Sequence, residues 1–162
     1  MIEIRAAEPA DAAPILSFIR KLAEYERLQH EVTATQTDIV RDLFCPDPRV
    51  FCEIALWDGV PAGFAFWFYN YSTFRGRHGI YLEDLFVEPV YRRRGIGKAL
   101  LARLAQRCQA EDLGRLEWSV LDWNTPSIDF YKSLGAEPMG DWTIFRLTGS
   151  ALGRLGEPRP QK

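Results

Sequence analysis

The sequence contains few of the residues that build metal sites and disulfide frameworks. Its 162 residues include two histidines and three cysteines, namely Cys45, Cys52 and Cys108, and no C-x-x-C pair occurs. An odd number of scattered cysteines is typical of free thiols in a reducing compartment, and so few His and Cys residues form no pattern of zinc ligands. We therefore expect neither disulfides nor a bound metal.

Long apolar runs and an excess of basic charge are also missing. No apolar stretch reaches the roughly 18 residues that a membrane-spanning helix needs, and the first 14 residues already carry four charged side chains. The formal net charge is −2 and the pI is about 5.7, whereas a protein that coats nucleic acid or an anionic membrane is normally basic. We expect a cytoplasmic protein without a signal peptide, which binds neither nucleic acid nor membranes.

The composition is that of an ordinary globular domain with many aromatic residues. Hydrophobic residues make up 47% of the chain and aromatic residues 13%, enough for a substantial core. Only residues 149–162 are rich in Gly, Pro and charge without an apolar pattern. We expect a single domain over residues 1–148, followed by a loose C-terminal tail.

The periodicity of apolar residues predicts an α+β fold with elements in the order βααβββαβαβ. A mixed, mostly antiparallel sheet flanked by helices follows from this order. The expected strands cover about residues 1–6, 50–57, 62–71, 80–87, 116–121 and 142–147. The expected helices are one that Asp11 caps, one over residues 35–44, one over 95–112 and a short one from Asn124 or Thr125 to Gly135. Asp58-Gly59 predicts a hairpin turn.

The connection after the strand at residues 80–87 carries a signal for anion binding. Arg92 to Lys98 reads RRRGIGK, which places two glycines where a helix begins. Exposed N–H groups and the helix dipole attract phosphate there, and the basic side chains add to this attraction. The Walker A pattern fails because Ala99 replaces its Ser or Thr, and the dinucleotide fingerprint fails because Leu100 replaces its third Gly. A solvated basic turn before an amphipathic helix is the alternative.

The spacing R-x-x-G-x-G, from Arg92 to Gly97, resembles the pyrophosphate loop of the GNAT acetyltransferases. The likeness extends along most of the chain, through YSTFRGRHGIYLEDLFV, YRRRGIG and VLDWNTPSIDFYKSLGA. These segments resemble the diamine (spermidine/spermine) acetyltransferases and the thialysine N-ε-acetyltransferases. The resemblance implies the GNAT fold, a homodimer, and transfer of acetyl from acetyl-CoA to the primary amine of a small molecule. In this family the amine attacks directly in a ternary complex, without a metal.

The resemblance also implies which residues contact acetyl-CoA. The backbone at Leu85, Phe86 and Val87 corresponds to the part that pairs with the pantetheine arm. The pyrophosphate corresponds to Arg92, Arg93, Arg94, Gly95, Ile96, Gly97 and Lys98, and the next helix start contributes Asn124, Thr125, Pro126 and Ser127. Relatives usually carry Gly at position 93, so we expect the amide of Arg93 to matter more than its guanidinium. Asn124 also fits a plain helix N-cap.

The implied catalytic residues are Tyr131 and Glu83. Tyr131 matches the family's general acid and also contacts the cofactor, and a phenol is able to protonate a departing thiolate. Glu83 and Asp84 are adjacent on a strand and therefore point to opposite faces. By resemblance Glu83 faces the substrate, where a base is needed because a free alkylamine has a pKa of about 10.4. Tyr25 and Glu26 match substrate-binding positions. The alternatives are a core tyrosine and structural or solvated carboxylates.

Two other functions are consistent with part of this pattern. One is a non-catalytic acyl-CoA-binding or sensing module, and the other is a protein-modifying acetyltransferase. The presence of both Glu83 and Tyr131 favours the enzyme over the sensor. The loop before the key strand has Ser72 where polyamine enzymes carry an acidic residue, and it adds Arg75 and Arg77. We therefore expect thialysine, lysine-like or other small amino-acid amines to be better acceptors than spermine.

Overall fold

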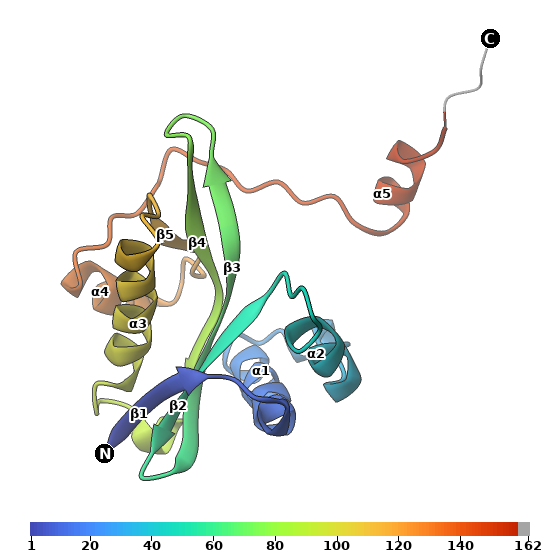
Figure 1. Cartoon of the computed structure of the whole chain (residues 1–162). Helices are drawn as coiled ribbons and strands as arrows, with labels where there is room; N and C mark the ends of the chain where they lie inside the picture. Colours follow the sequence, from blue (N-terminus) through green and yellow to red (C-terminus); the bar gives the residue numbers. More distant parts are fainter. Residues whose placement is uncertain (159–162) are drawn as a thin grey trace. The chain divides into compact units, whose positions relative to one another are not determined.

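The computed structural model describes residues 1–158 and divides into two compact units, residues 1–121 and residues 122–162, which are taken separately (Figure 1). The first unit contains β1 (Ile2–Ala6), α1 (Ala12–Tyr25), α2 (Gln36–Leu43), β2 (Phe51–Trp57), β3 (Val60–Ser72), β4 (Arg77–Val87), α3 (Ile96–Ala110) and β5 (Leu116–Trp118). Short 3-10 turns lie at Pro9–Asp11, Gln29–Glu31 and Pro89–Tyr91. The second unit contains α4 (Thr125–Ser133) and α5 (Gly149–Leu155). Within residues 1–158, no helix is both long and apolar enough to cross a membrane.

The strands of the first unit form one five-stranded sheet in the order β1-β2-β3-β4-β5. The first three pairings are antiparallel and the pairing of β4 with β5 is parallel, which confirms the predicted mixed, mostly antiparallel sheet. Asp58 and Gly59 join β2 to β3 with φ angles of 49° and 80°, as a tight hairpin with two left-handed residues requires. The predicted turn is therefore confirmed.

Helices pack on the sheet through apolar faces. Ile15 and Phe18 of α1 belong to a core cluster with Ile54, Phe64 and Phe86 of the strands, and the rings of Phe18 and Phe64 stack with centroids 5.7 Å apart. Alternate residues of β3 point to opposite faces, so Trp67 lies on the other face, where Arg107 of α3 stands 5.1 Å above its ring. Figure 1 shows α1 and α2 on one side of the sheet and α3 on the other.

In the second unit the short helix is present and the last predicted strand is not. Asn124 caps α4 and Gly135 follows it with φ +87°, as expected. Residues 142–147 form no strand in the described structure, and the prediction of a strand there is wrong for this chain taken alone. A strand needs a neighbour to pair its backbone groups, and a short segment rich in apolar residues does not supply one. In the described structure the side chains of Ile144 and Phe145 are exposed.

The C-terminal part bears on the predicted domain limits. The first compact unit ends at Leu121, and a single domain over residues 1–148 stays a prediction. Within the predicted loose tail, residues 149–162, the structure contains the short helix α5, whose side chains are mostly exposed. Residues 159–162 of the tail lie outside the described part of the chain.

Candidate active site

A β-bulge in β4 positions the two acidic residues of this strand. Phe66 of β3 pairs with Asp84 and Trp67 pairs with Leu82, so that Glu83 is the extra residue. Directly paired residues point to the same face of a sheet, which places Asp84 on the face that α1 covers and Leu82 on the face of α3. A regular strand would have put Leu82 and Asp84 on one face. The bulge therefore places a carboxylate in a mostly apolar layer.

Asp84 is the most perturbed carboxyl group of this region. Burial raises its pKa from 3.8 to about 7, and repulsion from the charges of Glu83 and Glu26 adds to the rise. Asp84 is half-buried, whereas Glu83 is exposed. A carboxyl group that titrates near neutral pH is suited to accept a proton in a catalytic step.

Glu26 reaches this region from the end of α1. It is the C-cap residue of the helix, directly after Tyr25, and burial raises its pKa as well. Its charge acts on Asp84, so the structure brings Glu26, Glu83 and Asp84 into one acidic group. Residues 1–158 contain no set of three or more His, Cys, Asp or Glu side chains placed to hold a metal ion. An organic cation, such as a substrate ammonium group, fits this acidic region.

The backbone after β4 has the geometry expected of the predicted anion loop. Arg93 has φ +61° and Gly95, the N-cap of α3, has φ +83°. The left-handed angle explains why glycine suits position 93, and an arginine there carries a backbone strain on the order of 1 kcal/mol. The first helical hydrogen bond runs from the N–H of Ala99 to the carbonyl of Gly95, at 2.9 Å. The N–H groups of Ile96, Gly97 and Lys98 precede this bond at the helix start, where they are available to an anion.

Two of the three arginines in this loop pack their guanidinium groups against aromatic rings of the protein. The guanidinium of Arg92 lies 5.4 Å from the ring centre of Tyr25 and 5.7 Å from that of Phe86, and its Nε donates to the carbonyl of Val87 at 3.0 Å. Arg92 therefore connects the loop to the end of α1. In the same way the guanidinium of Arg94 lies 4.8 Å above the ring of Trp57. Their predicted side-chain contacts with pyrophosphate stay a prediction, and the backbone fits that role better.

The end of β4 separates from β5. Only Ile80–Leu82 pairs with Leu116–Trp118, and β4 continues to Val87 beside β3 alone. Among residues 1–158 no strand covers the β5-side edge of residues 85–87, which are the residues predicted to pair with the pantetheine arm. The carbonyl of Val87 accepts from the Nε of Arg92, and the rest of this unpaired edge is able to pair with another extended, amide-containing chain.

The remaining predicted residues belong to the second unit. The side chain of Asn124 is buried and accepts a hydrogen bond from the N–H of Ser127 at 3.4 Å, so its role as an N-cap is confirmed. Thr125 and Pro126 form the first turn of α4. Tyr131 is half-buried, and its ring lies 5.4 Å from that of Phe130. Cofactor contacts of these residues, and proton donation by Tyr131, stay predictions.

The structure adds Asp84 as a candidate functional residue, which the sequence pattern did not single out. The Glu83-Asp84 pair is evident in the sequence, but the resemblance assigns the substrate-facing role to Glu83 alone. The available signal was two adjacent carboxylates in a strand whose other residues are mostly apolar. A bulge is not visible in such a pattern, because it depends on the register with β3.

Comparison with known proteins gives consistent results. A model of the acetyltransferase (GNAT) family matches residues 16–136. The thialysine N-epsilon-acetyltransferase of Bos taurus is 36% identical over 165 residues, which cover 95% of this chain and 96% of that protein. The L-ornithine N5-acetyltransferase of Arabidopsis thaliana is 32% identical over 194 residues, which cover 92% of this chain and 85% of that protein. Among solved structures, an integron cassette protein from the mobile metagenome of V. cholerae is similar with a TM-score of 0.80 at 24% identity, covering 97% of this chain and 98% of the other. The family match and this structural likeness confirm the predicted fold.

Proposed function

Because the chain belongs to the acetyltransferase (GNAT) family, we propose that this enzyme transfers an acetyl group from acetyl-CoA to the primary amine of a small amino acid. The observation that carries the proposal is the pairing of two features on one segment. Asp84 titrates near neutral pH, and the loop that follows its strand ends at a helix start with open N–H groups. The first feature suits deprotonation of an amine and the second suits a pyrophosphate.

Two neighbouring segments of the chain support binding of two parts of acetyl-CoA. The N–H groups of residues 96–98 fit the pyrophosphate, and the free edge at residues 85–87 fits the amide-containing arm. When bound, acetyl-CoA supplies an acetyl group activated as a thioester. The residues of this chain then have two tasks, which are to deliver the amine without its proton and to return a proton to the leaving sulfur.

We propose that Asp84 accepts the proton of the substrate ammonium group. A primary amine with a pKa of about 10.4 is almost fully protonated at neutral pH and cannot attack. The acidic region around Glu26 and Glu83 attracts the ammonium group, and Asp84 is ionised to a useful extent near pH 7. Glu83, at the exposed bulge position, remains a proposed ligand of the ammonium group. Tyr131 remains the proposed donor of the proton to the sulfur.

The proposed acceptor is an amino acid with a second amine. The names of two relatives describe acetylation of thialysine and of L-ornithine, which share a side-chain amine and a free α-carboxylate. In the sequence, Arg75 and Arg77 favoured a substrate with a carboxylate. Arg77 is ion-paired with Asp112 at 2.8 Å. Arg75 lies in the turn between β3 and β4 and is exposed.

Steady-state kinetics with a panel of amines tests the proposal. With acetyl-CoA saturating, CoA release is measured for thialysine, L-ornithine, L-lysine, lysine methyl ester and spermine. We expect the three amino acids to give higher kcat/KM values than spermine, and the methyl ester to be poorer than lysine because it lacks the carboxylate. Spermine as the clearly better acceptor would overturn the acceptor class, and no turnover with any amine would contradict the enzymatic proposal.

We propose in addition that the protein is a cytoplasmic homodimer. The three cysteines are free thiols, as is usual in a reducing compartment. The extended segment at residues 142–147 exposes Trp142, Ile144, Phe145 and Leu147, and a second copy of the chain is the proposed cover. The exposed apolar residues of this segment support its pairing as a strand in the dimer.

A further inference from the structure

The sheet face that carries Asp84 continues beyond α1 as a partly open aromatic surface. Phe66 of β3 pairs with Asp84 on this face. Two positions further along β3, Phe68 pairs with Tyr81 on the same face, and their rings lie 5.2 Å apart. These side chains are half-buried, whereas Trp67, on the opposite face under α3, is 1% exposed. Figure 1 shows β3 and β4 extending past α1 and α2. The sheet therefore presents an aromatic surface beside Asp84.

Arg115 crosses β4 on this same face. It directly precedes β5, and its carbonyl accepts a hydrogen bond from the N–H of Ile80 at 3.0 Å. Gly79 leaves room for the arginine, because a Cβ at position 79 would lie 2.9 Å from the Cγ of Arg115 and 2.7 Å from the Oδ1 of Asn70. Asn70 pairs with Gly79 and, by alternation along β3, points to the face of Phe68. The side chain of Arg115 therefore lies on the face with the aromatic surface.

Glu117 holds the guanidinium group of Arg115 by one nitrogen. Glu117 pairs with Tyr81 across β4 and β5, which places its carboxylate on the same face. Its Oε2 lies 2.7 Å from the Nε of Arg115 and accepts a hydrogen bond from the Nδ2 of Asn70 at 2.9 Å. Within residues 1–158, Nη1 and Nη2 of Arg115 take part in no ion pair or hydrogen bond, and 38% of the side chain is exposed. These two nitrogens are therefore accessible to a carboxylate, which a guanidinium group binds through two parallel hydrogen bonds.

The spacing between this guanidinium group and Asp84 fits a diamino acid. Tyr81 and Asp84 pair with β3 residues two positions apart, and Glu117 lies beside Tyr81, so the Cα atoms of Glu117 and Asp84 are about 8 Å apart. An extended lysine holds its side-chain amine about 7 Å from its carboxylate carbon. An amine at Asp84 therefore leaves the α-carboxylate near Arg115, and the methylene groups between them lie over the ring of Tyr81.

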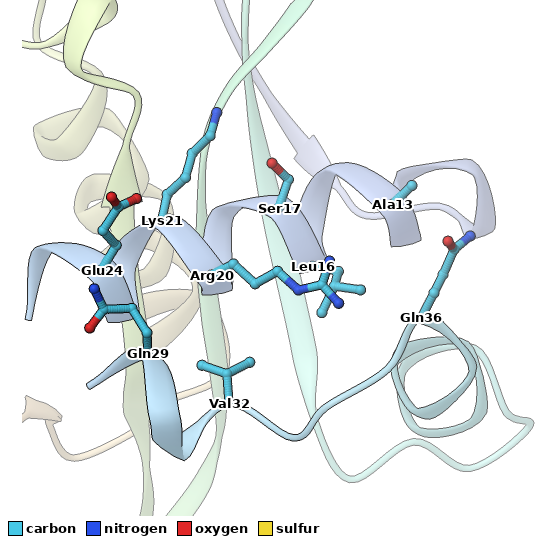
Figure 2. A pocket seen from close by; sticks show the side chains of 9 residues that line it. All are labelled: Ala13, Leu16, Ser17, Arg20, Lys21, Glu24, Gln29, Val32 and Gln36. Carbon is cyan, nitrogen blue, oxygen red and sulfur yellow. The ribbon is translucent and has the colours of Figure 1, made fainter. Parts of the chain in front are cut away.

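The pocket along the outer side of α1 has a different arrangement of charges. This cavity of about 560 Å³ is lined by one side of α1 and by the segment that leads into α2 (Figure 2). Figure 2 shows the guanidinium group of Arg20 pointing away from the carboxylate of Glu24, and both side chains are exposed. Opposite charges that point apart do not hold one ligand, so the sheet face is the better candidate for recognition of a substrate.

We propose that Arg115 binds the α-carboxylate of the acceptor amino acid and thereby determines specificity. The inference rests on the proposed acetylation and identifies the residue that distinguishes a diamino acid from a diamine of the same length. Asp84 meets the reacting amine at one end of the substrate, and Arg115 meets the carboxylate at the other. Glu117 is a positioning residue, because it holds the Nε of Arg115 and leaves the terminal nitrogens to the substrate.

A comparison of L-lysine with 1,5-diaminopentane tests this inference, because the diamine is lysine without its carboxylate. With acetyl-CoA saturating, the wild type should have a kcat/KM for L-lysine at least about tenfold above that for the diamine. Arg115→Gln should lower the L-lysine value roughly 10–100-fold, mainly through KM, and leave the diamine value within about twofold. Arg115→Lys keeps the charge without the paired N–H groups and should fall between the two. The matched control is Arg49→Gln, an exposed arginine before β2, which should behave as the wild type does.

A loss confined to the amino acid separates substrate binding from a structural role, which would lower turnover of both substrates alike. L-ornithine with 1,4-diaminobutane is a second matched pair. Equal wild-type kcat/KM values for amino acid and diamine, or a parallel loss with both in Arg115→Gln, would overturn the role of Arg115 and leave the acetylation standing. If Arg115→Gln does not fold, the wild-type comparison and Arg115→Lys decide. Absence of turnover with every amine would overturn the acetylation and this inference with it.

Discussion

At the scale of single residues, Asp84 combines a stability cost with a chemical use. Its pKa is raised to about 7 in the folded protein, whereas an unfolded chain releases this proton near 3.8. Between these values the folded state binds more protons, so its stability falls as the pH rises from about 4 to about 7. Above about pH 7 the ionised Asp84 lowers the free energy of unfolding by its full amount, on the order of a few kcal/mol. A carboxylate held at such a cost is a candidate catalytic group.

The variant Asp84→Asn tests both aspects. We expect kcat/KM of the wild-type enzyme to fall as the pH drops through about 7, because Asp84 becomes protonated. Asp84→Asn should lose this limb of the pH profile and turn over roughly 10²–10⁴-fold more slowly, the usual effect of a lost general base. Its melting temperature at pH 8 should be higher than that of the wild type, because the amide carries no buried charge.

Glu83→Gln distinguishes the two neighbouring carboxylates. Removal of the Glu83 charge removes a repulsion that raises the pKa of Asp84, so the acidic limb of kcat/KM should move to lower pH. If Glu83 were the base, the limb would disappear in Glu83→Gln and persist in Asp84→Asn. That outcome would contradict the assignment to Asp84.

Tyr131→Phe tests the proposed proton donor. The variant keeps the ring, which packs beside Phe130, and loses only the phenol oxygen. We expect unchanged CoA affinity by calorimetry and a kcat lower by roughly 10²–10⁴-fold. Tyr91→Phe, also half-buried, is the matched control and should keep its kcat. Equal kcat values for Tyr131→Phe and wild type, with chemistry rate-limiting, would show that the phenol oxygen has no part in catalysis.

At the scale of elements, the start of α3 depends on backbone geometry more than on its arginines. Gly95 requires a left-handed angle of +83°, so replacement by valine would strain the chain even though a Cβ there would touch only Ile2, at 4.0 Å. Gly97 is the second residue of α3, in its first turn, where glycine is less favourable than alanine by at most the roughly 0.5–1 kcal/mol of a helix interior. A substitution at position 97 therefore allows an effect on cofactor binding to be distinguished from a loss of stability.

Gly97→Ala should stabilise the protein slightly and weaken CoA binding. The methyl group favours the helix by up to about 1 kcal/mol but stands where a pyrophosphate approaches the N–H groups. Thermal unfolding and calorimetry with CoA measure the two effects. Gly153→Ala, at an open helical glycine of α5, is the matched control and should leave the CoA affinity unchanged. A Gly97→Ala protein with wild-type CoA affinity would argue against cofactor binding at this loop.

At the scale of the whole molecule, the exposed apolar segment of the second unit bears on assembly. Phe145 is 91% exposed and Ile144 75% exposed, within the apolar-rich segment 142–147 that was predicted to be a strand. An unpaired extended segment with this exposure is a favourable site for pairing with a second chain.

Light scattering after size-exclusion chromatography should therefore give twice the chain mass of 18.6 kDa. Phe145→Glu should give the monomer mass, because it places a charge within the proposed interface. The matched control is Phe74→Glu, which makes the same change at a 97% exposed phenylalanine of the β3–β4 turn and should remain dimeric. A monomeric wild type would contradict the dimer, and a monomeric Phe74→Glu beside a dimeric Phe145→Glu would contradict the role of residues 142–147.

The features predictable from the sequence are those that a few neighbouring residues decide. Asp58-Gly59 makes its hairpin because both residues tolerate left-handed angles, and Asn124 caps its helix through an N–H three residues away. The start of α3 follows from glycines within the loop itself. The loop motif together with several other continuous segments indicated the family for the same reason, and the family model over residues 16–136 confirms it.

Only the tertiary structure decided which carboxylate is perturbed and where the arginines point. The bulge at Glu83 depends on register with β3, and the pKa of Asp84 depends on burial under α1 and on Glu26, 58 positions away by residue number. Arg92 turns onto Tyr25 and Phe86 because packing brings two distant rings beside it. Burial and charge repulsion act through space, so no local pattern contains them.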